Sequence, residues 1–279
     1  MPELPEVETI RRDLDKEVVG KRIKTVEVTG MRSIRRHTQK KQFISRLEGK
    51  KILGVERKGK YLLVRLEGGD FLVIHLGMSG QLLWSKAGKE EKAKHTHVVF
   101  TFSTPGQLRF LDPRTFGELF VTTADDLDAA VPELAHLGFD PVEQVMSWTH
   151  FGELLHARKR KLKDLLMDQK FLAGIGNLYS DEILWAAGLR YDRSSDDLTS
   201  QEIRRLSRAM TEVLHDAIKH RGSSLADEQY RDLYGVVGGY AGEHNVYDRE
   251  GEPCRRCRSL VVRIKLGGRS HFLCEQCQI

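Results

Sequence analysis

The chain has 279 residues, of which 40% are hydrophobic and 30% charged, and its formal net charge is +5. This length allows two or three domains with buried cores. No run of residues approaches the roughly 18 apolar positions of a membrane-spanning helix, and the start has neither the basic nor the apolar region of a secretory signal. We therefore expect a soluble cytoplasmic protein, whose four cysteines are not disulfide-bonded in that reducing compartment.

The positive charge is concentrated in two stretches. Residues 31–60 contain eleven Lys or Arg and two acidic residues, and residues 158–163 (RKRKLK) contain five basic residues in six. Such patches suit a polyanion, because Lys and Arg that dock onto phosphates displace condensed counterions. A solvated basic surface has the same composition. Charge therefore suggests nucleic acid as a partner without establishing it.

Apolar periodicity predicts the elements in chain order. A helix is expected over residues 6–20, where apolar residues recur at helical spacing: Val7, Ile10, Leu14 and Val18. Residues 22–122 contain short apolar or alternating runs separated by Gly and Pro turns, which predicts an antiparallel sandwich or barrel. Residues 148–221 are expected to be helical, and the glycine-rich segment 234–245 is expected to be a loop of low order.

The clearest helix of the second half lies within residues 198–220. Thr199 and Glu202 fit a capping box at its start. Seven apolar residues then form one stripe, which we interpret as a core face rather than a cofactor site: Ile203, Leu206, Met210, Val213, Leu214, Ala217 and Ile218.

All four cysteines of the chain lie near its end, in two C-x2-C pairs separated by sixteen residues: Cys254, Cys257, Cys274 and Cys277. Two such pairs place four thiolates around one Zn²⁺ ion, and four protein ligands make the site structural because a catalytic zinc keeps an open position. The segment between the pairs is predicted to be a β-hairpin, with Arg269 beside Gly267 and Gly268 at its tip. A basic tip held in this way suits contact with a phosphate.

A second motif, GIGN at residues 174–177, separates two apolar helical segments. A turn that opens onto a helix N-terminus presents free backbone N–H groups to a phosphate, with the Asn177 amide beside them. A glycine-rich turn between helices is also common without any such role.

The N-terminal sequence MPELPEVETI crowds two prolines and three glutamates into eight positions. Removal of Met1 would expose the secondary amine of Pro2, and α-amino groups have a pKa near ~8, below the ~10.4 of lysine. Such an amine is a nucleophile at neutral pH and forms an iminium with a carbonyl or a sugar C1′. The alternative is that the prolines only begin the first helix.

Seven motifs in order along the chain resemble those of bacterial formamidopyrimidine-DNA glycosylase, over essentially the whole length: PELPEVET, KGKYLL, HLGMSG, KHTHV, DPRTFG, GIGNLYSDE and the four-cysteine unit. The resemblance implies a bifunctional DNA glycosylase and abasic-site lyase for oxidised purines such as 8-oxoguanine and formamidopyrimidines. The substrate is double-stranded DNA with damaged bases, the cofactor is one structural Zn²⁺ ion, and a bacterial monomer associated with the nucleoid is the simplest expectation.

The resemblance also implies roles for individual residues. Pro2 would attack C1′ and form a Schiff base, and Glu3 would be the general acid that opens the sugar, with Glu6 in the same pocket. Lys60 would bind phosphate and take part in β-elimination, and Arg269 would grip phosphate and take part in δ-elimination.

Further DNA contacts follow by the same resemblance: His75, His95, Arg114, Arg158 and Asn177. A base inside a duplex must be flipped out before C1′ can be attacked, and the resulting void must be filled. Met78, Arg114 and Phe116 resemble the residues that fill it, although core packing is the alternative for Met78 and Phe116. Segment 234–245 resembles the loop that closes over the flipped base.

The resemblance implies an α+β fold in three domains. Residues 1–130 would form an N-terminal antiparallel β-sandwich with an N-terminal helix, residues 131–245 a helical domain with a helix–two-turn–helix motif and the lesion-recognition loop, and residues 246–279 the zinc β-hairpin. Two residues depart from the pattern. Thr115 stands where many relatives have a second arginine, which is expected to alter contact with the unpaired base, and Arg258 replaces a glycine after the second cysteine.

Three other functions fit parts of the sequence. An endonuclease VIII-like enzyme for oxidised pyrimidines usually begins Pro-Glu-Gly-Pro-Glu, whereas this chain has Leu4 in the middle. A zinc-containing DNA-binding protein without chemistry would have no use for a free terminal secondary amine. A tautomerase with an N-terminal proline would not bind DNA, and its activity would not fall steeply with salt.

Overall fold

The computed structural model describes residues 1–88 and 90–279, which form two compact units. Unit 1 contains residues 1–135 and 220–239, and unit 2 contains residues 136–219 and 240–279. The chain therefore returns to unit 1 over residues 220–239 before it completes unit 2. Within the described residues, no helix is both long enough and apolar enough to cross a membrane.

Unit 1 is built on two four-stranded antiparallel sheets. The first has the order β1 (Ile23–Val28), β6 (Thr96–Phe102), β7 (Gln107–Leu111), β5 (Gln81–Ser85). The second has the order β2 (Ile52–Lys58), β3 (Tyr61–Leu66), β4 (Asp70–His75), β8 (Glu118–Thr123). The predicted antiparallel sandwich with an N-terminal helix is confirmed. Strand β5, the short run QLLWS, lies within the predicted range 22–122 and has one buried apolar residue, Leu82.

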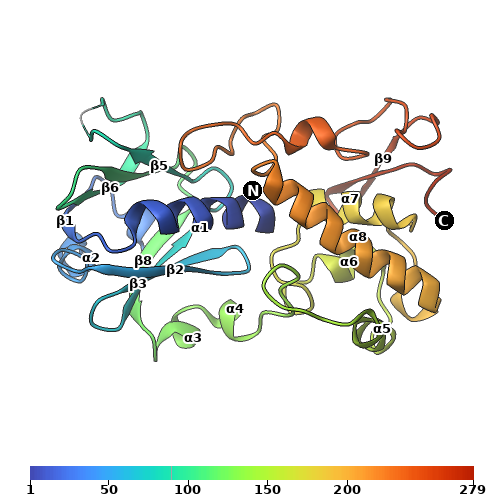
Figure 1. Cartoon of the computed structure of the whole chain (residues 1–279), viewed down its shortest axis with the longest axis horizontal. Coiled ribbons are helices and arrows are strands. Elements are labelled where there is room, and N and C mark those ends of the chain that lie inside the picture. The colour runs from blue at the N-terminus through green and yellow to red at the C-terminus, as the bar shows by residue number, and fades with distance from the viewer. Residues whose placement is uncertain (89) are drawn as a thin grey trace. The chain divides into compact units, whose positions relative to one another are not determined.

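Helix α1 (Leu4–Val18) packs along β2 and β3 (Figure 1). The four apolar residues predicted from its periodicity are buried in the core of the unit, together with apolar residues of both sheets. The helix begins at Leu4, two residues before the expected start, because Pro5 is accommodated in the first turn, where its missing N–H would have no helical partner. Unit 1 also contains α2 (Lys40–Ser45), α3 (Leu127–Ala130), α4 (Pro132–Ala135) and the 3-10 turn η1 (Arg32–Ile34).

Residues 220–239 complete unit 1 by returning to α1. The Arg221 guanidinium pairs with Asp232 at 2.6 Å and also contacts Asp13 of α1, and both carboxylates are buried. The backbone N–H of Trp84 in β5 donates to the Leu233 carbonyl at 2.8 Å. Residues 234–239 form a loop, as expected, in which the backbone N–H groups of Tyr234 and Val236 each donate to the buried Asp232 carboxylate at 2.9 Å, and residues 240–243 form the turn η3 (Tyr240–Glu243) in unit 2.

Unit 2 is mainly helical. It contains α5 (Trp148–His156), α6 (Leu162–Leu166), α7 (Asn177–Ala187) and α8 (Ser200–Lys219), with the 3-10 turn η2 (Ser195–Asp197). Helix α8 packs against α5 and α7 (Figure 1), and all seven residues of its predicted stripe are buried. Its capping box is also confirmed, because Thr199 N–H donates to the Glu202 carboxylate at 2.8 Å and Glu202 N–H donates to the Thr199 hydroxyl at 3.3 Å.

The predicted C-terminal hairpin is confirmed as β9 (Val262–Leu266) and β10 (Arg269–Leu273), which pair antiparallel. Its two-residue turn consists of Gly267 and Gly268, with φ of 57° and 75°. Positive φ at both positions matches the right-handed twist of the two strands and is adopted by glycine at little cost. Arg269 is therefore the first residue after the turn.

Candidate active site

The start of α1 holds two buried glutamates. The Glu3 N–H donates to Glu6 Oε2 at 2.8 Å, and Glu3 and Glu6 make the reciprocal contacts of a capping box. Glu6 Oε1 accepts the Ser223 N–H at 2.9 Å, so the carboxylate also holds the 220–239 segment. Pro2 is buried next to them. A helix N-terminus stabilises carboxylates because its free N–H groups and its dipole are positive.

Lys60 lies in the turn between β2 and β3, where Lys58 pairs with Tyr61. Burial lowers the pKa of the Lys60 ammonium, and the negative charges of Glu3 and Glu6 oppose this shift. The structure thus places Lys60 within electrostatic reach of both glutamates. Residues predicted from two separate motifs, PELPEVET and KGKYLL, therefore gather at the N-terminus of α1.

A buried ion pair that the sequence prediction missed connects α1 to the Lys60 turn. Arg57 of β2 is 1% exposed, and its Nε donates to Glu8 Oε2 at 3.1 Å while its Nη1 donates to the Gly59 carbonyl at 3.1 Å. Arg57 follows Val55 by two residues, so strand alternation already places it on the inward side. This period-2 position was the signal that could have found it.

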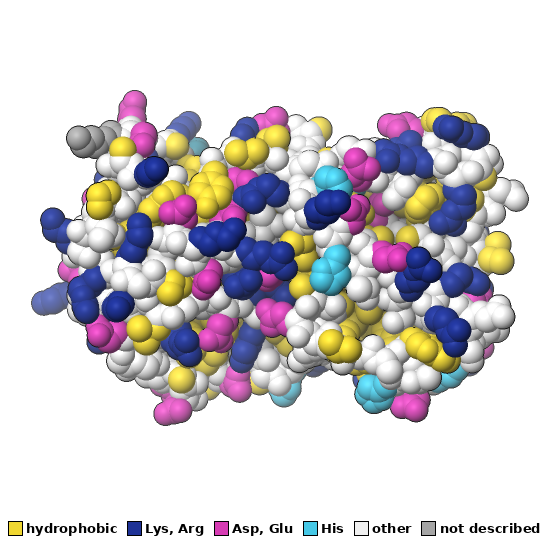
Figure 2. Space-filling model, in the orientation of Figure 1, with side chains coloured by type: hydrophobic (Ala, Val, Ile, Leu, Met, Phe, Trp, Pro, Cys, Tyr) yellow, Lys and Arg dark blue, Asp and Glu magenta, His cyan; other side chains and the backbone are white. Residues whose placement is uncertain are grey.

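The Glu8 carboxylate also accepts hydrogen bonds from Arg11 and Arg12. Burial would raise the pKa of Glu8, but these hydrogen bonds and the charges of Arg11 and Arg57 outweigh burial and lower it from 4.5 to about 2. On the face shown in Figure 2, Lys and Arg side chains gather over the region of α1 and β2. Glu8 is the buried acceptor beneath part of this basic surface.

Because the pKa of Glu8 is lowered on folding, its ion pairs stabilise the fold above pH 4.5 and lose this effect as the pH falls toward 2. We expect Glu8→Gln to lower the free energy of unfolding at pH 7 by on the order of 2–3 kcal/mol, and by much less at pH 2.5. Denaturant unfolding at both pH values measures this. The exposed pair of Glu67 and Arg22 supplies the control, since Glu67→Gln should leave stability nearly unchanged at both pH values. Equal losses at the two pH values would contradict the assignment.

His75 ends β4 and packs against Tyr61, with ring centroids 4.6 Å apart. Burial lowers the pKa of His75; the Glu118 carboxylate opposes this shift, and Lys60 is among the cations that reinforce it. A neutral imidazole at pH 7 suits hydrogen bonding rather than charge pairing with DNA. His75 therefore lies close to the predicted catalytic group.

The three predicted void-filling residues lie in two loops of unit 1. Met78 and Phe116 are 43% and 45% exposed, which excludes the core-packing alternative for both. The Arg114 guanidinium lies 4.9 Å from the Phe116 ring centroid. His95 precedes β6 with a φ of 65°, and its carbonyl accepts the Asp112 N–H at 3.1 Å. All of these residues belong to the unit that holds Pro2, Glu3 and Lys60.

The other predicted DNA contacts lie in unit 2. Asn177 is the first residue of α7, after Gly176 at the N-cap, and its buried Oδ1 has no hydrogen-bond partner within the described residues. The Arg158 guanidinium stacks over Phe171 at 5.0 Å and donates to the Leu154 carbonyl at 2.8 Å. Arg269 is exposed at the hairpin turn.

The four cysteines converge in unit 2. Their Sγ atoms all lie within 4.8 Å of one another, with 3.9 Å between Cys254 and Cys277 and 3.4 Å between Cys257 and Cys274. Four thiolates about 2.3 Å from one Zn²⁺ ion would be about 3.8 Å apart, and disulfide sulfurs would be only about 2 Å apart. The cluster thus fits one structural zinc ion. The Trp185 indole N–H and the Arg256 N–H each donate to Cys254 Sγ at 3.4 Å, which supports a thiolate there.

A second buried ion pair, also missed from the sequence, fixes the hairpin to α7. Lys163 Nζ lies 2.7 Å from Asp181 Oδ1 and donates to the Ser270 carbonyl at 3.1 Å, and Asp181 Oδ2 accepts the Phe272 N–H at 3.0 Å. Lys163 is 1% exposed, so the basic run 158–163 is not wholly a surface patch. Burial raises the pKa of Asp181 to about 7, against the Lys163 charge. The pair holds the strand that begins with Arg269.

Loss of a zinc ligand should be visible at Trp185. By atomic emission, we expect one zinc ion per chain in the wild-type protein and less than about 0.1 zinc ion per chain in Cys277→Ser. Chelation of the zinc should change the tryptophan fluorescence of the wild-type protein, because Trp185 donates to a ligand sulfur. The variant Trp185→Phe should keep its zinc and lose most of the fluorescence change. Full zinc content in Cys277→Ser would contradict a four-cysteine site.

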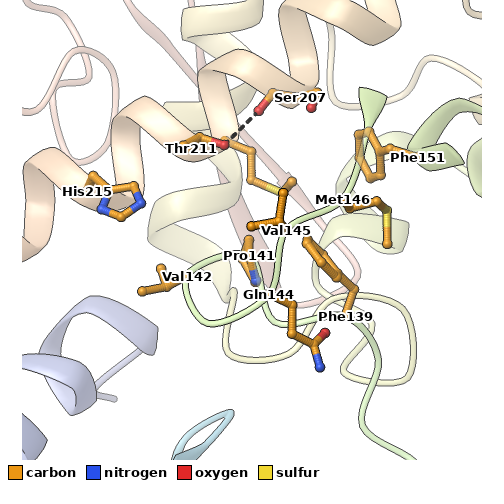
Figure 3. Close-up of a pocket in the computed structure, with 11 residues that line it drawn as sticks. Phe139, Pro141, Val142, Gln144, Val145, Met146, Phe151, Ser207, Thr211 and His215 are labelled. Carbon is orange, nitrogen blue, oxygen red and sulfur yellow. Dashed lines mark hydrogen bonds between the residues drawn. The ribbon is translucent and has the colours of Figure 1, made fainter. Parts of the chain in front are cut away.

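Unit 2 also contains a pocket away from these residues (Figure 3). Ser207, Thr211 and His215 of α8 line one side, and segment 139–146 with its mostly apolar side chains lines the other. The Thr211 hydroxyl donates to the Ser207 carbonyl at 3.3 Å and so makes its contact within the helix. None of the residues predicted for chemistry or DNA contact lines this pocket.

Three family models match the chain: the formamidopyrimidine-DNA glycosylase N-terminal domain over residues 1–119, the H2TH domain of the same enzymes over residues 137–229, and the zinc finger found in FPG and IleRS over residues 251–279. Formamidopyrimidine-DNA glycosylase of Pelotomaculum thermopropionicum is 41% identical over 100% of this chain and 99% of its own length. This chain belongs to the formamidopyrimidine-DNA glycosylase family.

Solved structures of other glycosylases of the family have the same fold. The crystal structure of MutM (Fpg) from Thermus thermophilus is 40% identical, with a TM-score of 0.87 over 99% of this chain and 98% of that one. A Lactococcus lactis Fpg in complex with DNA that contains an abasic site is 34% identical, with a TM-score of 0.88 over 99% of each chain. The α+β fold with its zinc hairpin is therefore confirmed.

Proposed function

We propose that this protein is a bifunctional DNA glycosylase and abasic-site lyase that excises oxidised purines from double-stranded DNA. The observation that carries the proposal is the group of Glu3, Glu6 and Lys60 at the start of α1, beside the buried Pro2. Family membership supports it, as do relatives crystallised with abasic-site DNA and with carbocyclic 8-oxo-G DNA. The zinc site supports it through the hairpin that carries Arg269.

In the proposed reaction, removal of Met1 frees the Pro2 nitrogen. This nitrogen attacks C1′ of the flipped nucleotide while the bond from C1′ to the base breaks, and the base leaves with the bonding electrons and gains a proton. Glu3 protonates the ring oxygen as the sugar opens, which leaves an iminium between Pro2 and C1′. The neighbouring Glu6 and its negative charge stabilise this cation.

Strand cleavage follows from the same intermediate. Loss of a C2′ proton expels the 3′ phosphate, a second elimination expels the 5′ phosphate, and water hydrolyses the imine. Lys60 binds phosphate and assists the first elimination, and Arg269 assists the second. His75, His95, Arg114, Arg158 and Asn177 bind the DNA, and Met78, Arg114 and Phe116 fill the void left by the flipped base.

The three-part division into residues 1–130, 131–245 and 246–279 also stays a proposal. In it, the zinc ion holds the hairpin with Cys254, Cys257, Cys274 and Cys277, and the protein acts as a monomer associated with the bacterial nucleoid through DNA. The two compact units described above cut the chain differently, because residues 220–239 pack on α1.

Borohydride trapping tests the nucleophile and the substrate together. Incubation with a duplex containing one 8-oxoguanine, followed by borohydride, should give a covalent adduct that maps to Pro2. Glu3→Gln should release the base at least about 100-fold more slowly, the range expected for loss of a general acid. Glu212→Gln, in an exposed pair with Arg208 on α8, is the control. No adduct, in protein shown by mass to lack Met1 and to contain zinc, would exclude the oxidised-purine reaction.

A duplex with an oxidised pyrimidine is the next substrate, because an endonuclease VIII-like specificity would give the adduct there. Binding without any adduct on either duplex would leave a zinc-containing DNA-binding protein.

The salt dependence of DNA binding distinguishes an enzyme that acts on DNA from one that acts on a small molecule. Contacts with several phosphates should weaken DNA binding by at least about tenfold between 50 and 200 mM salt. Arg269→Ala should reduce the slope of log affinity against log salt by about 1, and fluorescence anisotropy with a labelled duplex measures both. A slope near zero would favour the tautomerase alternative.

A further inference from the structure

The void-filling side chains of unit 1 come from two separate loops. Met78 lies in the turn 76–80 after β4, and Arg114 and Phe116 lie in the segment 112–117 between β7 and β8. A side chain that fills the space of an everted base must keep its place relative to the others, because stacking and hydrogen bonding depend on sub-ångström geometry. What joins the two loops therefore matters for the proposed reaction.

One buried carboxylate joins them. Asp112 is 0% exposed, and its Oδ1 accepts the Ser79 hydroxyl at 2.5 Å and the Arg114 N–H at 3.2 Å, while its Oδ2 accepts the Gly117 N–H at 2.7 Å. Ser79 is adjacent to Met78 and is itself 0% exposed. The Asp112 carboxylate thus contacts both loops, on either side of Phe116.

The backbone around Asp112 is strained and closely packed. Thr115 has a φ of 55°, which is unfavourable for a β-branched residue, and its N–H donates to the Asp112 carbonyl at 3.3 Å. A Cβ at Gly77 would lie 2.6 Å from the Gly117 nitrogen, so the two loops meet backbone to backbone. Such a conformation persists only where its surroundings hold it, and the Asp112 carboxylate supplies three of the holding contacts.

We propose that Asp112 is the positioning residue for Met78, Arg114 and Phe116. It holds their two loops in the arrangement that enters the duplex, and it acts on base eversion rather than on the chemistry at C1′. This proposal rests on the proposed glycosylase function. It assigns the aspartate of the DPRTFG motif a role in the geometry of void filling.

Asp112→Asn is a sharp test because it keeps the size of the side chain. The N–H groups of Arg114 and Gly117 donate to different oxygens of the Asp112 carboxylate. An amide has one oxygen and one NH₂ group, so in Asp112→Asn one of these two N–H groups would face a donor instead of an acceptor. We expect single-turnover release of 8-oxoguanine from a duplex to slow by at least about tenfold. Cleavage of a duplex with a preformed abasic site, which has no base to evert, should change by less than about threefold, the residual effect of weaker void filling.

Two further variants make the test specific. Ser79→Ala removes only the contact from the Met78 loop and should slow base release by a smaller factor, again without slowing abasic-site cleavage. Asp70→Asn, at the opposite end of β4 where Asp70 pairs with Arg46, should leave both rates unchanged. Thermal melts of each variant show that it is folded, and Ser79→Ala carries the test if Asp112→Asn is not.

The outcomes separate the two proposals. Wild-type protein that releases no base contradicts the glycosylase function, and this inference fails with it. If the wild-type protein is active, two results for Asp112→Asn contradict only the positioning role. One is equal slowing of base release and abasic-site cleavage, and the other is that Asp112→Asn has the same rates as Asp70→Asn. Selective loss of base release in Asp112→Asn and Ser79→Ala supports it.

Discussion

The Glu8–Arg57 ion pair fixes the N-terminal helix on the second sheet of unit 1. Both groups are buried, so their mutual hydrogen bond and the further donors around Glu8 replace the water that each charge has lost. Arg57 also donates to the Gly59 carbonyl, next to Lys60. One buried network therefore sets the position of the helix start relative to the lysine turn, and the candidate active site depends on that position.

Unit 2 uses the same kind of interaction for a different element. Lys163 and Asp181 form a buried ion pair, and both side chains also form hydrogen bonds with the backbone of β10. The four cysteines bind the other end of the hairpin. The two anchors together leave Arg269 exposed on a strand that cannot rotate freely, which is the arrangement expected of a residue that grips a phosphate.

Local signals explain where the elements were predicted well. Thr199 with Glu202, the stripe of α8 and the glycine pair of the hairpin are all set by neighbours close in sequence. The prediction did not find contacts between residues that are distant in the sequence. The pairing of Arg221 with Asp232 and with Asp13 of α1, for example, has no local pattern that would indicate it.

The sequence by itself determined the residue types that chemistry needs: a proline after Met1 beside two glutamates, a lysine in the KGKYLL motif, and four cysteines at zinc spacing. The cysteine site is read from its spacing, whereas the roles of Glu3, Glu6 and Lys60 follow from the resemblance to the family motifs. Only the tertiary structure decided which charged residues are buried and what they hold. Lys163 and Asp112 look like ordinary surface charges in the sequence, and strand alternation indicates only that Arg57 points inward. Their partners lie 18, 33 and 49 positions away. Folding alone brings such partners together, and the cost of burying an unpaired charge then makes each contact obligatory.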